Sequence, residues 1–180
     1  MRIFCFGAGG MWVFGYGSLM WRPGFDFVER RLGLVRGYHR SLCIYSHVHR
    51  GTPQLPGLVL GLDRGGSCRG VAFRVEDEAA AAVLAYLRER ELVTHVYRER
   101  ELGVRLDDGR SLRATAYVVD TRHPQYAGRL DRPQLLALVQ QGLGHSGWNS
   151  DYVRSTHRHL EELGLLDPTL KWLSDQLEMS

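Results

Sequence analysis

The sequence predicts an α+β fold, a mixed, largely antiparallel and barrel-like sheet with helices packed outside it. Three observations support this fold class. In the first half of the 180-residue chain, short runs rich in β-branched and aromatic residues alternate with glycine or proline, which is typical of strands. One alanine-rich segment interrupts the strands, and the last third carries apolar residues at helical spacing. Strands followed by helices, rather than strict alternation, favour α+β over a parallel α/β fold.

Seven strands are predicted, each bounded by glycine, proline or a polar turn. Their residue ranges are 12–16, 32–38, 42–46, 58–62, 70–75, 94–99 and 111–119. The turn Asp107-Asp108-Gly109 joins the last two. No internal repeat, low-complexity tract or Ser/Gly linker divides the chain. We therefore expect one sheet within a single domain over residues 11–178.

Two helices are predicted from the residues at their ends. The alanine-rich segment 77–90 opens with acidic residues, as a first helical turn should. Its apolar stripe consists of Val83, Tyr86 and Leu87. The other helix has Asp131 as its N-cap and Pro133 near its start, and it ends at Gly142 or Gly144.

Two further helices complete the chain. Asn149 or Ser150 caps the first of them, and Gly164 ends it. Its apolar stripe has helical spacing and consists of Val153, Thr156, Leu160 and Leu163. Asp167-Pro168 opens the last helix, which is short and carries Leu170, Trp172, Leu173 and Leu177.

The composition is that of an ordinary globular protein. Apolar residues make up 44% and charged residues 24% of the chain, which argues against disorder, collagen and coiled coil. The 23 basic and 20 acidic residues leave a net charge of +3, and no five basic residues stand in a row. The charge therefore does not indicate a nucleic-acid partner or an anionic membrane. No apolar run reaches transmembrane length, and nothing implies an obligate protein partner.

Cysteine usage points to a reducing compartment. Cys5, Cys43 and Cys68 are too few and too scattered for a disulfide framework, so we expect a cytoplasmic protein. Residues 1–10 contain a short apolar stretch but not the longer apolar core of a signal peptide. We expect these ten residues to be a disordered extension, because the patterned sequence begins at Met11.

The most informative motif follows the first predicted strand. Residues 13–21 read Val-Phe-Gly-Tyr-Gly-Ser-Leu-Met-Trp, so a hydrophobic strand runs directly into Gly-x-Gly-Ser. Small residues let backbone N–H groups approach a ligand closely, and such turns can form anion-binding nests. The alternative is an ordinary strand-to-loop turn. The motif is neither a P-loop nor a dinucleotide fingerprint, because it lacks Gly-Lys-Ser/Thr and a third glycine opening a helix.

Three glutamates compete for the role of a general base. Glu89 lies in the charged run at the end of the alanine-rich helix, and Glu99 lies in the following strand. Glu91 lies where the helix gives way to that strand, so its side chain can point into the mouth of the sheet. A carboxylate there can act as a base if burial raises its pKa above about 4.3. The residues alone leave the choice open, and an exposed surface glutamate is the alternative for each.

The other candidate residues carry weaker signals. Residues 49–57 form a loop with two prolines and two glycines that reads as a surface connection. His47 and His49 share one face of a strand, but no metal-binding motif accompanies them, so no metal site is predicted. Ser18 lacks the Gly-x-Ser-x-Gly context of a hydrolase nucleophile. Tyr152 is either a core residue or a hydroxyl that faces a pocket.

In combination, the motifs resemble the ChaC-type γ-glutamylcyclotransferases, the glutathione-specific branch of the γ-glutamylcyclotransferase-like fold. The resemblance covers residues 11–177. The matching segments are Tyr16-Gly17-Ser18-Leu19 with Trp21, His49-Arg50-Gly51-Thr52-Pro53 with Pro56-Gly57, Tyr86-Leu87 with Arg90-Glu91, and Asn149 with Tyr152. The His-Arg-Gly loop and the Arg-Glu pair are specific to the ChaC branch.

The resemblance implies an intracellular enzyme that cleaves glutathione to 5-oxoproline and cysteinylglycine. The α-amine of the substrate attacks its own γ-carbonyl, Glu91 acts as general acid/base, and no cofactor takes part. The loop after the first strand holds the γ-glutamyl carboxylate through its backbone amides, and one tyrosine lies at the pocket. The implied substrate-binding residues are Val13, Phe14, Gly15, Tyr16, Gly17, Ser18, Leu19 and Tyr152. The alternatives are a cyclotransferase for other γ-glutamyl amines or amino acids, and a non-catalytic binding or regulatory module.

The chain departs from the family pattern at two places. Leu92-Val93-Thr94-His95 follows the Arg-Glu pair, where the family often has a glycine-rich stretch. Ala82 stands where some members carry an acidic residue, which argues against an essential second carboxylate.

Overall fold

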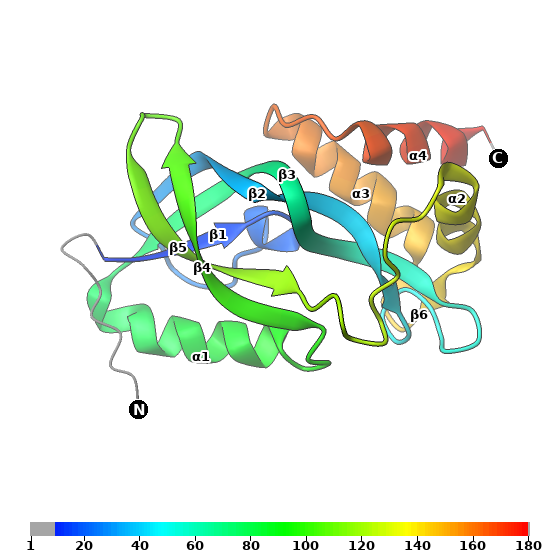
Figure 1. Cartoon of the computed structure of the whole chain (residues 1–180), viewed down its shortest axis with the longest axis horizontal. Coiled ribbons are helices and arrows are strands. Elements are labelled where there is room, and N and C mark those ends of the chain that lie inside the picture. Colours follow the sequence, from blue (N-terminus) through cyan, green and yellow to red (C-terminus); the bar gives the residue numbers. More distant parts are fainter. Residues whose placement is uncertain (1–9, 180) are drawn as a thin grey trace. The chain divides into compact units, whose positions relative to one another are not determined.

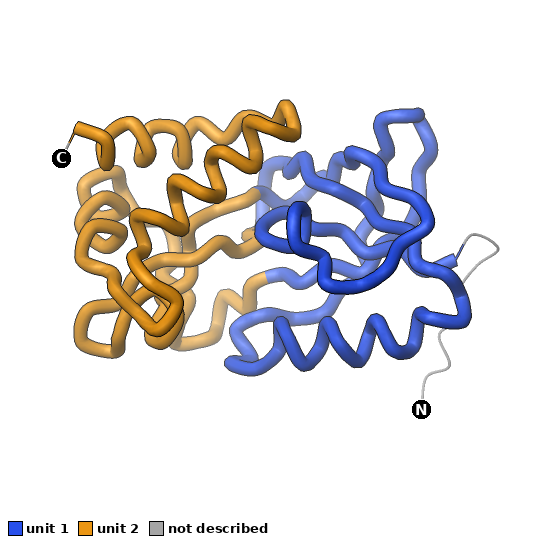
Figure 2. The backbone as a smooth tube through the Cα atoms, turned by 180° about the vertical axis from the view of Figure 1, so that it is seen from behind, with its two compact units in different colours: residues 1–39, 64–118 blue, residues 40–63, 119–180 orange. Residues whose placement is uncertain are grey.

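The computed structural model describes residues 10–179. The chain packs into two compact units, each assembled from two separate segments (Figure 2). Unit 1 contains residues 1–39 and 64–118, and unit 2 contains residues 40–63 and 119–180, apart from the undescribed ends. The extension expected over residues 1–10 lies, except for Gly10, outside the described residues. The single domain over residues 11–178 stays a prediction.

Five strands form a closed barrel in the order β1-β3-β2-β4-β5 (Figure 1). They are β1 (Met11–Gly15), β2 (Glu29–Ser46), β3 (Gly57–Val75), β4 (Tyr97–Leu106) and β5 (Ser111–Val119). β1 pairs antiparallel with β3, and β2 pairs antiparallel with β4. A parallel contact between Val13 and Thr115 joins β1 to β5. The predicted mixed, largely antiparallel barrel is therefore confirmed.

Two pairs of predicted strands are single long strands. β2 replaces the strands expected over 32–38 and 42–46, and β3 replaces those over 58–62 and 70–75. Both long strands contain glycines with positive φ, which is +86° at Gly37 and +96° at Gly65. Glycine adopts such angles without steric cost, so it can bend a strand without ending it.

The strand predicted over 94–99 begins later, at Tyr97. The chain first makes a turn in which the N–H of His95 donates to the carbonyl oxygen of Leu92 at 3.2 Å. His95 has a φ of +57°, which is uncommon for a residue other than glycine. The turn takes the chain from the preceding helix into β4.

The alanine-rich segment forms one 3-10 turn, η2 (Asp77–Ala79), and then the helix α1 (Ala80–Glu91). Val83 and Leu87 are buried on its apolar face, and Tyr86 is partly buried. They pack into one cluster whose other buried members include Met11, Val13, Leu19, Val75 and Tyr117. This packing fixes α1 against the first strand and the turn that follows it.

Unit 2 contains the remaining helices, which pack on one another. They are α2 (Arg132–Gln141), α3 (Asn149–Glu162) and α4 (Pro168–Glu178). A two-stranded hairpin that the sequence did not predict, β6 (Leu143–Gly144) with β7 (Gly147–Trp148), connects α2 to α3. Asp131 caps α2 in a reciprocal capping box with Gln134, as its spacing predicts. Asp167 caps α4 by accepting hydrogen bonds from two backbone N–H groups.

The N-cap predicted for α3 is wrong. Trp148 is the N-cap, and Asn149 is the first residue of the helix. The Asn149 side chain is fully buried and makes two 2.7 Å hydrogen bonds to Leu58, one to its N–H and one to its carbonyl oxygen. Asn149 thus ties α3 to β3, because its amide matches the free donor and acceptor of a strand residue.

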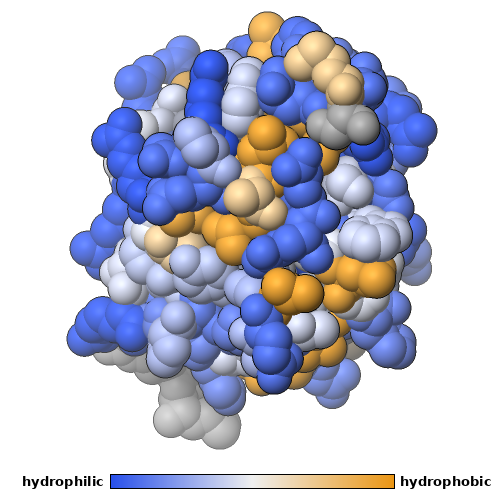
Figure 3. Space-filling model, turned by 90° about the vertical axis from the view of Figure 1, so that its right-hand side faces the viewer, coloured by the Kyte–Doolittle hydropathy of each residue, from blue (hydrophilic) through white to orange (hydrophobic). Residues whose placement is uncertain are grey.

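Apolar side chains are visible in patches between hydrophilic ones on the side where α2 lies in Figure 1 (Figure 3). The exposed large apolar residues of unit 2 include Val48, Leu55, Leu143, Trp148 and Leu166. Apolar atoms form more than half of an ordinary protein surface, so such patches do not by themselves indicate a partner.

Candidate active site

The glycine-rich segment predicted as the substrate loop begins in the barrel and ends in a short 3-10 helix. β1 ends at Gly15, and η1 (Ser18–Met20) begins two residues after Tyr16. A Cβ atom on Gly15 would lie 2.9 Å from the Cβ of Leu19. Only glycine therefore allows the chain to fold back this closely after the strand.

Only the middle of this loop is open to a ligand. The buried members of the predicted set are Val13, Phe14, Gly15, Tyr16 and Leu19. Gly17 is half-buried and Ser18 is exposed. The first N–H bonded within η1 is that of Met20, which donates to the carbonyl oxygen of Gly17 at 2.9 Å. The N–H groups of Gly17, Ser18 and Leu19 have no acceptor inside that helix, so a ligand here would meet backbone donors and one hydroxyl.

Arg90, near the end of α1, binds the segment that follows the glycine turn. Its Nη2 donates to Ser18 Oγ at 2.9 Å. Its Nη1 donates to the carbonyl oxygens of Arg22 and Pro23 at 2.8 and 3.1 Å, and to the hydroxyl of Tyr86 at 3.2 Å. One guanidinium group therefore joins the last turn of the helix to the loop.

Glu91 is the last residue of α1 and lies beside this junction. Its side chain is 19% exposed, and burial raises the pKa of its carboxyl above the ordinary 4.5. The Arg90 guanidinium opposes that rise, with Nε 3.2 Å from Glu91 Oε1. The C-terminal end of a helix carries partial negative charge, which also disfavours an ionised carboxyl. Glu91 therefore holds a proton more readily than a surface glutamate does.

The structure separates the three glutamates that the sequence left open. Glu89 is exposed on α1. Glu99 accepts two hydrogen bonds from Arg88, at 2.8 and 2.7 Å, and these bonds lower the pKa of its carboxyl. A carboxylate held ionised in this way is a poor proton acceptor. Of the three, Glu91 combines burial with a raised pKa, which is the environment of a general base.

Tyr117, on β5, lies in the same region and was not predicted from sequence. Its carbonyl oxygen accepts a hydrogen bond from the hydroxyl of Tyr16 at 2.8 Å, and its own hydroxyl donates to Glu99 at 3.1 Å. Burial raises the pKa of Tyr117, and the charge of Glu91 adds to that rise. Glu91 is therefore within electrostatic reach of Tyr117. No sequence signal marks this tyrosine, because it lies within an apolar strand.

Tyr152 lies on α3 in unit 2, whereas the loop and Glu91 belong to unit 1. It is half-buried, and its hydroxyl accepts a hydrogen bond from the N–H of Leu60 at 3.1 Å. The guanidinium of Arg50 lies 5.5 Å from the centre of its ring and donates to the carbonyl oxygen of Trp148 at 3.1 Å. The grouping of Tyr152 with Glu91 in one site stays a prediction.

The loop that carries Arg50 is built by close backbone packing, so it is more than a surface connection. A Cβ atom on either Gly57 or Gly142 would collide with the carbonyl oxygen of Arg50. The N–H of Arg50 donates to the buried Ser46 hydroxyl at 2.9 Å, and His49 Nδ1 lies 2.9 Å from Ser146 Oγ. The backbone of Arg50 is therefore held from several sides.

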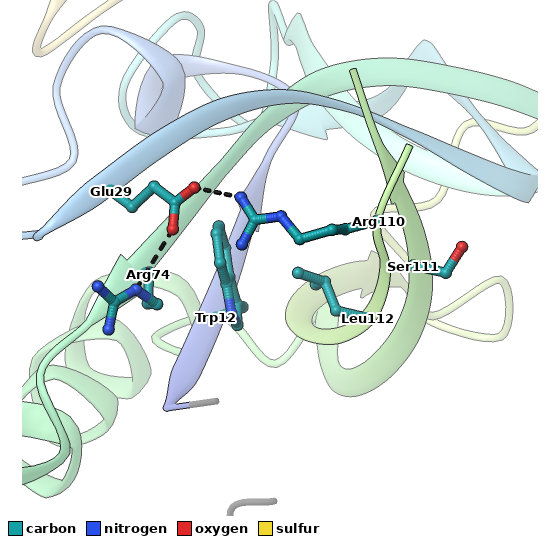
Figure 4. Close-up of a pocket in the computed structure, with 6 residues that line it drawn as sticks. All are labelled: Trp12, Glu29, Arg74, Arg110, Ser111 and Leu112. Atoms are coloured by element: carbon teal, nitrogen blue, oxygen red, sulfur yellow. Dashed lines mark hydrogen bonds and ion pairs between the residues drawn. The ribbon is translucent and has the colours of Figure 1, made fainter. Parts of the chain in front are cut away.

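Unit 1 also contains a pocket of about 490 Å³ on the face of β1 opposite to the side chain of Val13 (Figure 4). It is lined by Trp12, Glu29, Arg74, Arg110, Ser111 and Leu112. Glu29 forms ion pairs with Arg74 and Arg110, and Arg110 holds the pKa of Glu29 below its ordinary value. Because these charges satisfy one another, the pocket offers no poised acid or base.

The residues that the structure describes provide no further class of site. Nowhere in residues 10–179 do three His, Cys, Asp or Glu side chains gather as metal ligands would. No helix in this part of the chain is long and apolar enough to cross a membrane.

The chain is similar in sequence to proteins of known function. The family model described as ChaC-like protein matches residues 11–179. The glutathione-specific γ-glutamylcyclotransferase of Escherichia coli (strain K12) is 37% identical over 162 residues, which are 90% of this chain and 70% of that protein. The glutathione-specific γ-glutamylcyclotransferase 1 of Homo sapiens is 37% identical over 147 residues, which are 79% of this chain and 66% of the human protein.

A solved structure shares the fold. The crystal structure of a γ-glutamyl cyclotransferase specific to glutathione from yeast superposes with a TM-score of 0.83. The match covers 95% of this chain and 96% of the yeast chain, at 22% sequence identity. At this identity the superposition establishes the fold alone.

Proposed function

Because the chain belongs to the ChaC-like protein family, we propose that it is a glutathione-specific γ-glutamylcyclotransferase. The names of its 37%-identical relatives support this activity. One structural observation carries the chemistry: Glu91 is a partly buried carboxyl with a raised pKa, beside an arginine that binds the glycine loop. Glutathione is the partner, and neither a cofactor, a nucleic acid, a membrane nor an obligate protein partner is needed. Cys43 and Cys68 are buried and form no disulfide with each other, which fits a reducing cytoplasm.

The loop after β1 binds the γ-glutamyl group of the substrate. Backbone N–H groups between Tyr16 and Met20 and the hydroxyl of Ser18 donate to the substrate carboxylate, because they precede the first hydrogen bond of η1. Buried side chains keep this backbone rigid, and Tyr152 lines the pocket. The proposed binding residues are Val13, Phe14, Gly15, Tyr16, Gly17, Ser18, Leu19 and Tyr152.

Glu91 moves the protons of the reaction. It takes a proton from the substrate α-ammonium, and the freed amine attacks the γ-carbonyl carbon to close a five-membered lactam. The bond between that carbon and the cysteine nitrogen then breaks. Of the three ammonium hydrogens, one stays on the lactam nitrogen and two reach the leaving nitrogen through Glu91, which is regenerated as carboxylate. A positioned acid/base contributes roughly 10²–10⁴-fold.

Folding the substrate onto itself provides the larger part of the acceleration. The nucleophile and the electrophile belong to one molecule, and well-oriented intramolecular reactions reach effective molarities of about 10⁵–10⁸ M. A rigid loop that fixes the carboxylate beside the attacking amine is therefore well suited to this reaction.

The test is to incubate the purified chain with glutathione and to quantify cysteinylglycine and 5-oxoproline by mass spectrometry. We expect both products in equal amounts. γ-Glutamyl-alanine and γ-glutamyl-lysine are compared with glutathione at equal concentration. Faster turnover of either compound would identify it, instead of glutathione, as the preferred substrate. Binding of γ-glutamyl compounds without any product would show a binding module instead of an enzyme.

A further inference from the structure

We infer that Arg90 is a positioning residue that couples the substrate loop to the catalytic carboxylate. The inference deepens the proposed function and rests on it. Arg90 Nε contacts Glu91, while the two Nη atoms contact Ser18, Arg22, Pro23 and Tyr86. A single side chain thus touches both the base and the loop that holds the substrate.

The shape of the guanidinium makes this double contact possible. Arginine presents five N–H donors in a rigid plane, whereas lysine carries three donors on one nitrogen. Nε points to Glu91 at 3.2 Å, and Nη2 reaches Ser18 Oγ at 2.9 Å. The Arg90 side chain is 22% exposed, so surrounding protein restrains its orientation. A lysine here can supply the positive charge but cannot reach both contacts in the same geometry.

The first consequence concerns the hydroxyl of Ser18. A guanidinium group donates and never accepts, so Ser18 Oγ must be the acceptor in its bond with Arg90. The hydroxyl hydrogen is then left to donate in another direction. Because Ser18 is exposed, that hydrogen is available to the carboxylate of the bound γ-glutamyl group. Arg90 thereby sets the direction in which Ser18 donates.

The second consequence concerns the charge on Glu91. Burial favours the protonated carboxyl, and the Arg90 guanidinium is the neighbouring charge that favours the ionised form. Glu91 must be ionised to take a proton from the substrate ammonium. Arg90 therefore favours the ionised form of Glu91 while it also binds the loop.

Four variants assayed with glutathione distinguish the two roles of Arg90, its contact with the loop and its charge beside Glu91. Arg90→Gln removes both the charge and the forked contacts, and Arg90→Lys keeps the charge alone. Ser18→Ala removes the contact between Arg90 and the loop together with the hydroxyl that donates to the substrate, and it leaves the charge beside Glu91 in place. Arg74→Gln is the matched control, because Arg74 is also partly exposed and ion-paired but lies in the pocket of Figure 4. KM, kcat and the pH dependence of kcat/KM are determined for each.

Arg90→Gln is expected to raise KM about tenfold or more, because charge-assisted hydrogen bonds are the strong ones. It also moves the acid limb of kcat/KM to higher pH by about one unit, since an opposite charge within a few ångströms lowers a carboxyl pKa by at least that much. Arg90→Lys raises KM but keeps the acid limb near that of the wild type. Ser18→Ala behaves like Arg90→Lys, and Arg74→Gln matches the wild type.

The inference is overturned if Arg90→Gln has the KM and the acid limb of the wild type. It is also overturned if Arg74→Gln changes KM and the acid limb as much as Arg90→Gln does. Carbon-13 NMR titration of the Glu91 carboxyl, in wild type and in Arg90→Gln without substrate, does not depend on turnover. An unchanged Glu91 pKa there refutes the coupling to the base even if the chain releases no product. Absence of product with a shifted pKa would instead refute the proposed function alone. If Arg90→Gln does not fold, Arg90→Lys and Ser18→Ala still test the loop contact.

Discussion

A carboxyl on the last residue of a helix experiences the partial negative charge of the helix end, and burial removes the water that would solvate it. Glu91 is in this position, and Arg90 provides the opposing positive charge. The balance leaves a carboxyl whose pKa lies above 4.5. A residue that both accepts and returns a proton needs this intermediate tendency.

Replacing this carboxyl tests its role directly. Glu91→Gln should lower kcat by about 100-fold or more, because the amide cannot take a proton from the substrate ammonium. Glu89→Gln makes the same change two residues earlier, on the exposed face of α1, and should leave kcat unchanged. Release of cysteinylglycine from glutathione is the measurement. Wild-type turnover in Glu91→Gln would show that another group is the base.

The raised pKa of Glu91 also predicts two pH dependences. The base must be ionised, so kcat/KM of the wild type should fall as the pH drops through a value above 4.5.

The stability of the fold should depend on pH in the opposite direction to kcat/KM. A carboxyl whose pKa is higher in the folded state than in the unfolded state stabilises the fold below the unfolded pKa. That contribution is lost as the pH rises through the folded pKa. The melting temperature of Glu91→Gln should therefore rise relative to that of the wild type as the pH increases above about 4.5. A difference that shrinks over this range would contradict the assigned direction.

Sequence reasoning at this scale could name the candidate base but could not choose it. Glu89, Glu91 and Glu99 lie within eleven positions and differ little in local pattern. Their environments differ because Arg88 reaches Glu99 across the helix–strand turn and holds it ionised, whereas burial dominates at Glu91 and Glu89 is exposed. The family resemblance selected Glu91, and its burial supports that choice.

The position of Glu91 depends on the packing of α1 against the barrel. Leu87, one turn before Glu91, is fully buried against the barrel. Leu87→Ala should lower the free energy of unfolding by about 2–5 kcal/mol, the usual cost of deleting a buried leucine side chain. Urea unfolding followed by circular dichroism measures this loss. Ala82→Ser, on the exposed face of α1, is the control and should change stability by less than about 0.5 kcal/mol.

Among the elements, caps and turns were easier to predict than strand lengths. Asp131 and Asp167 are N-caps as their spacing indicated, because a cap involves residues three positions apart. Four predicted strands are the two strands β2 and β3, because a chain that bends at glycine can continue as one strand. The cap of α3 was missed because Asn149 pairs instead with Leu58, 91 positions away.

At the scale of the whole molecule, the two compact units are interleaved along the chain. β2 and β3 each contribute residues to both units, so neither unit is a continuous piece of sequence. We expect thermal unfolding to be one cooperative transition, because melting one unit removes strand segments continuous with the other. Differential scanning calorimetry should give equal calorimetric and van't Hoff enthalpies. Two resolved transitions would contradict the prediction of a single domain.

The sequence by itself determined the family, the α+β class, the helices and the glycine turn, because each depends on residues that are close together in the chain. The family resemblance is confirmed by the match over residues 11–179 and by relatives of 37% identity. Tertiary structure alone decided which carboxyl is buried and which arginine binds the loop. Arg90 and Ser18 are 72 positions apart, and Tyr16 and Tyr117 are 101 apart. Burial and charge pairing over such separations depend on how the chain closes on itself, which local patterns do not contain.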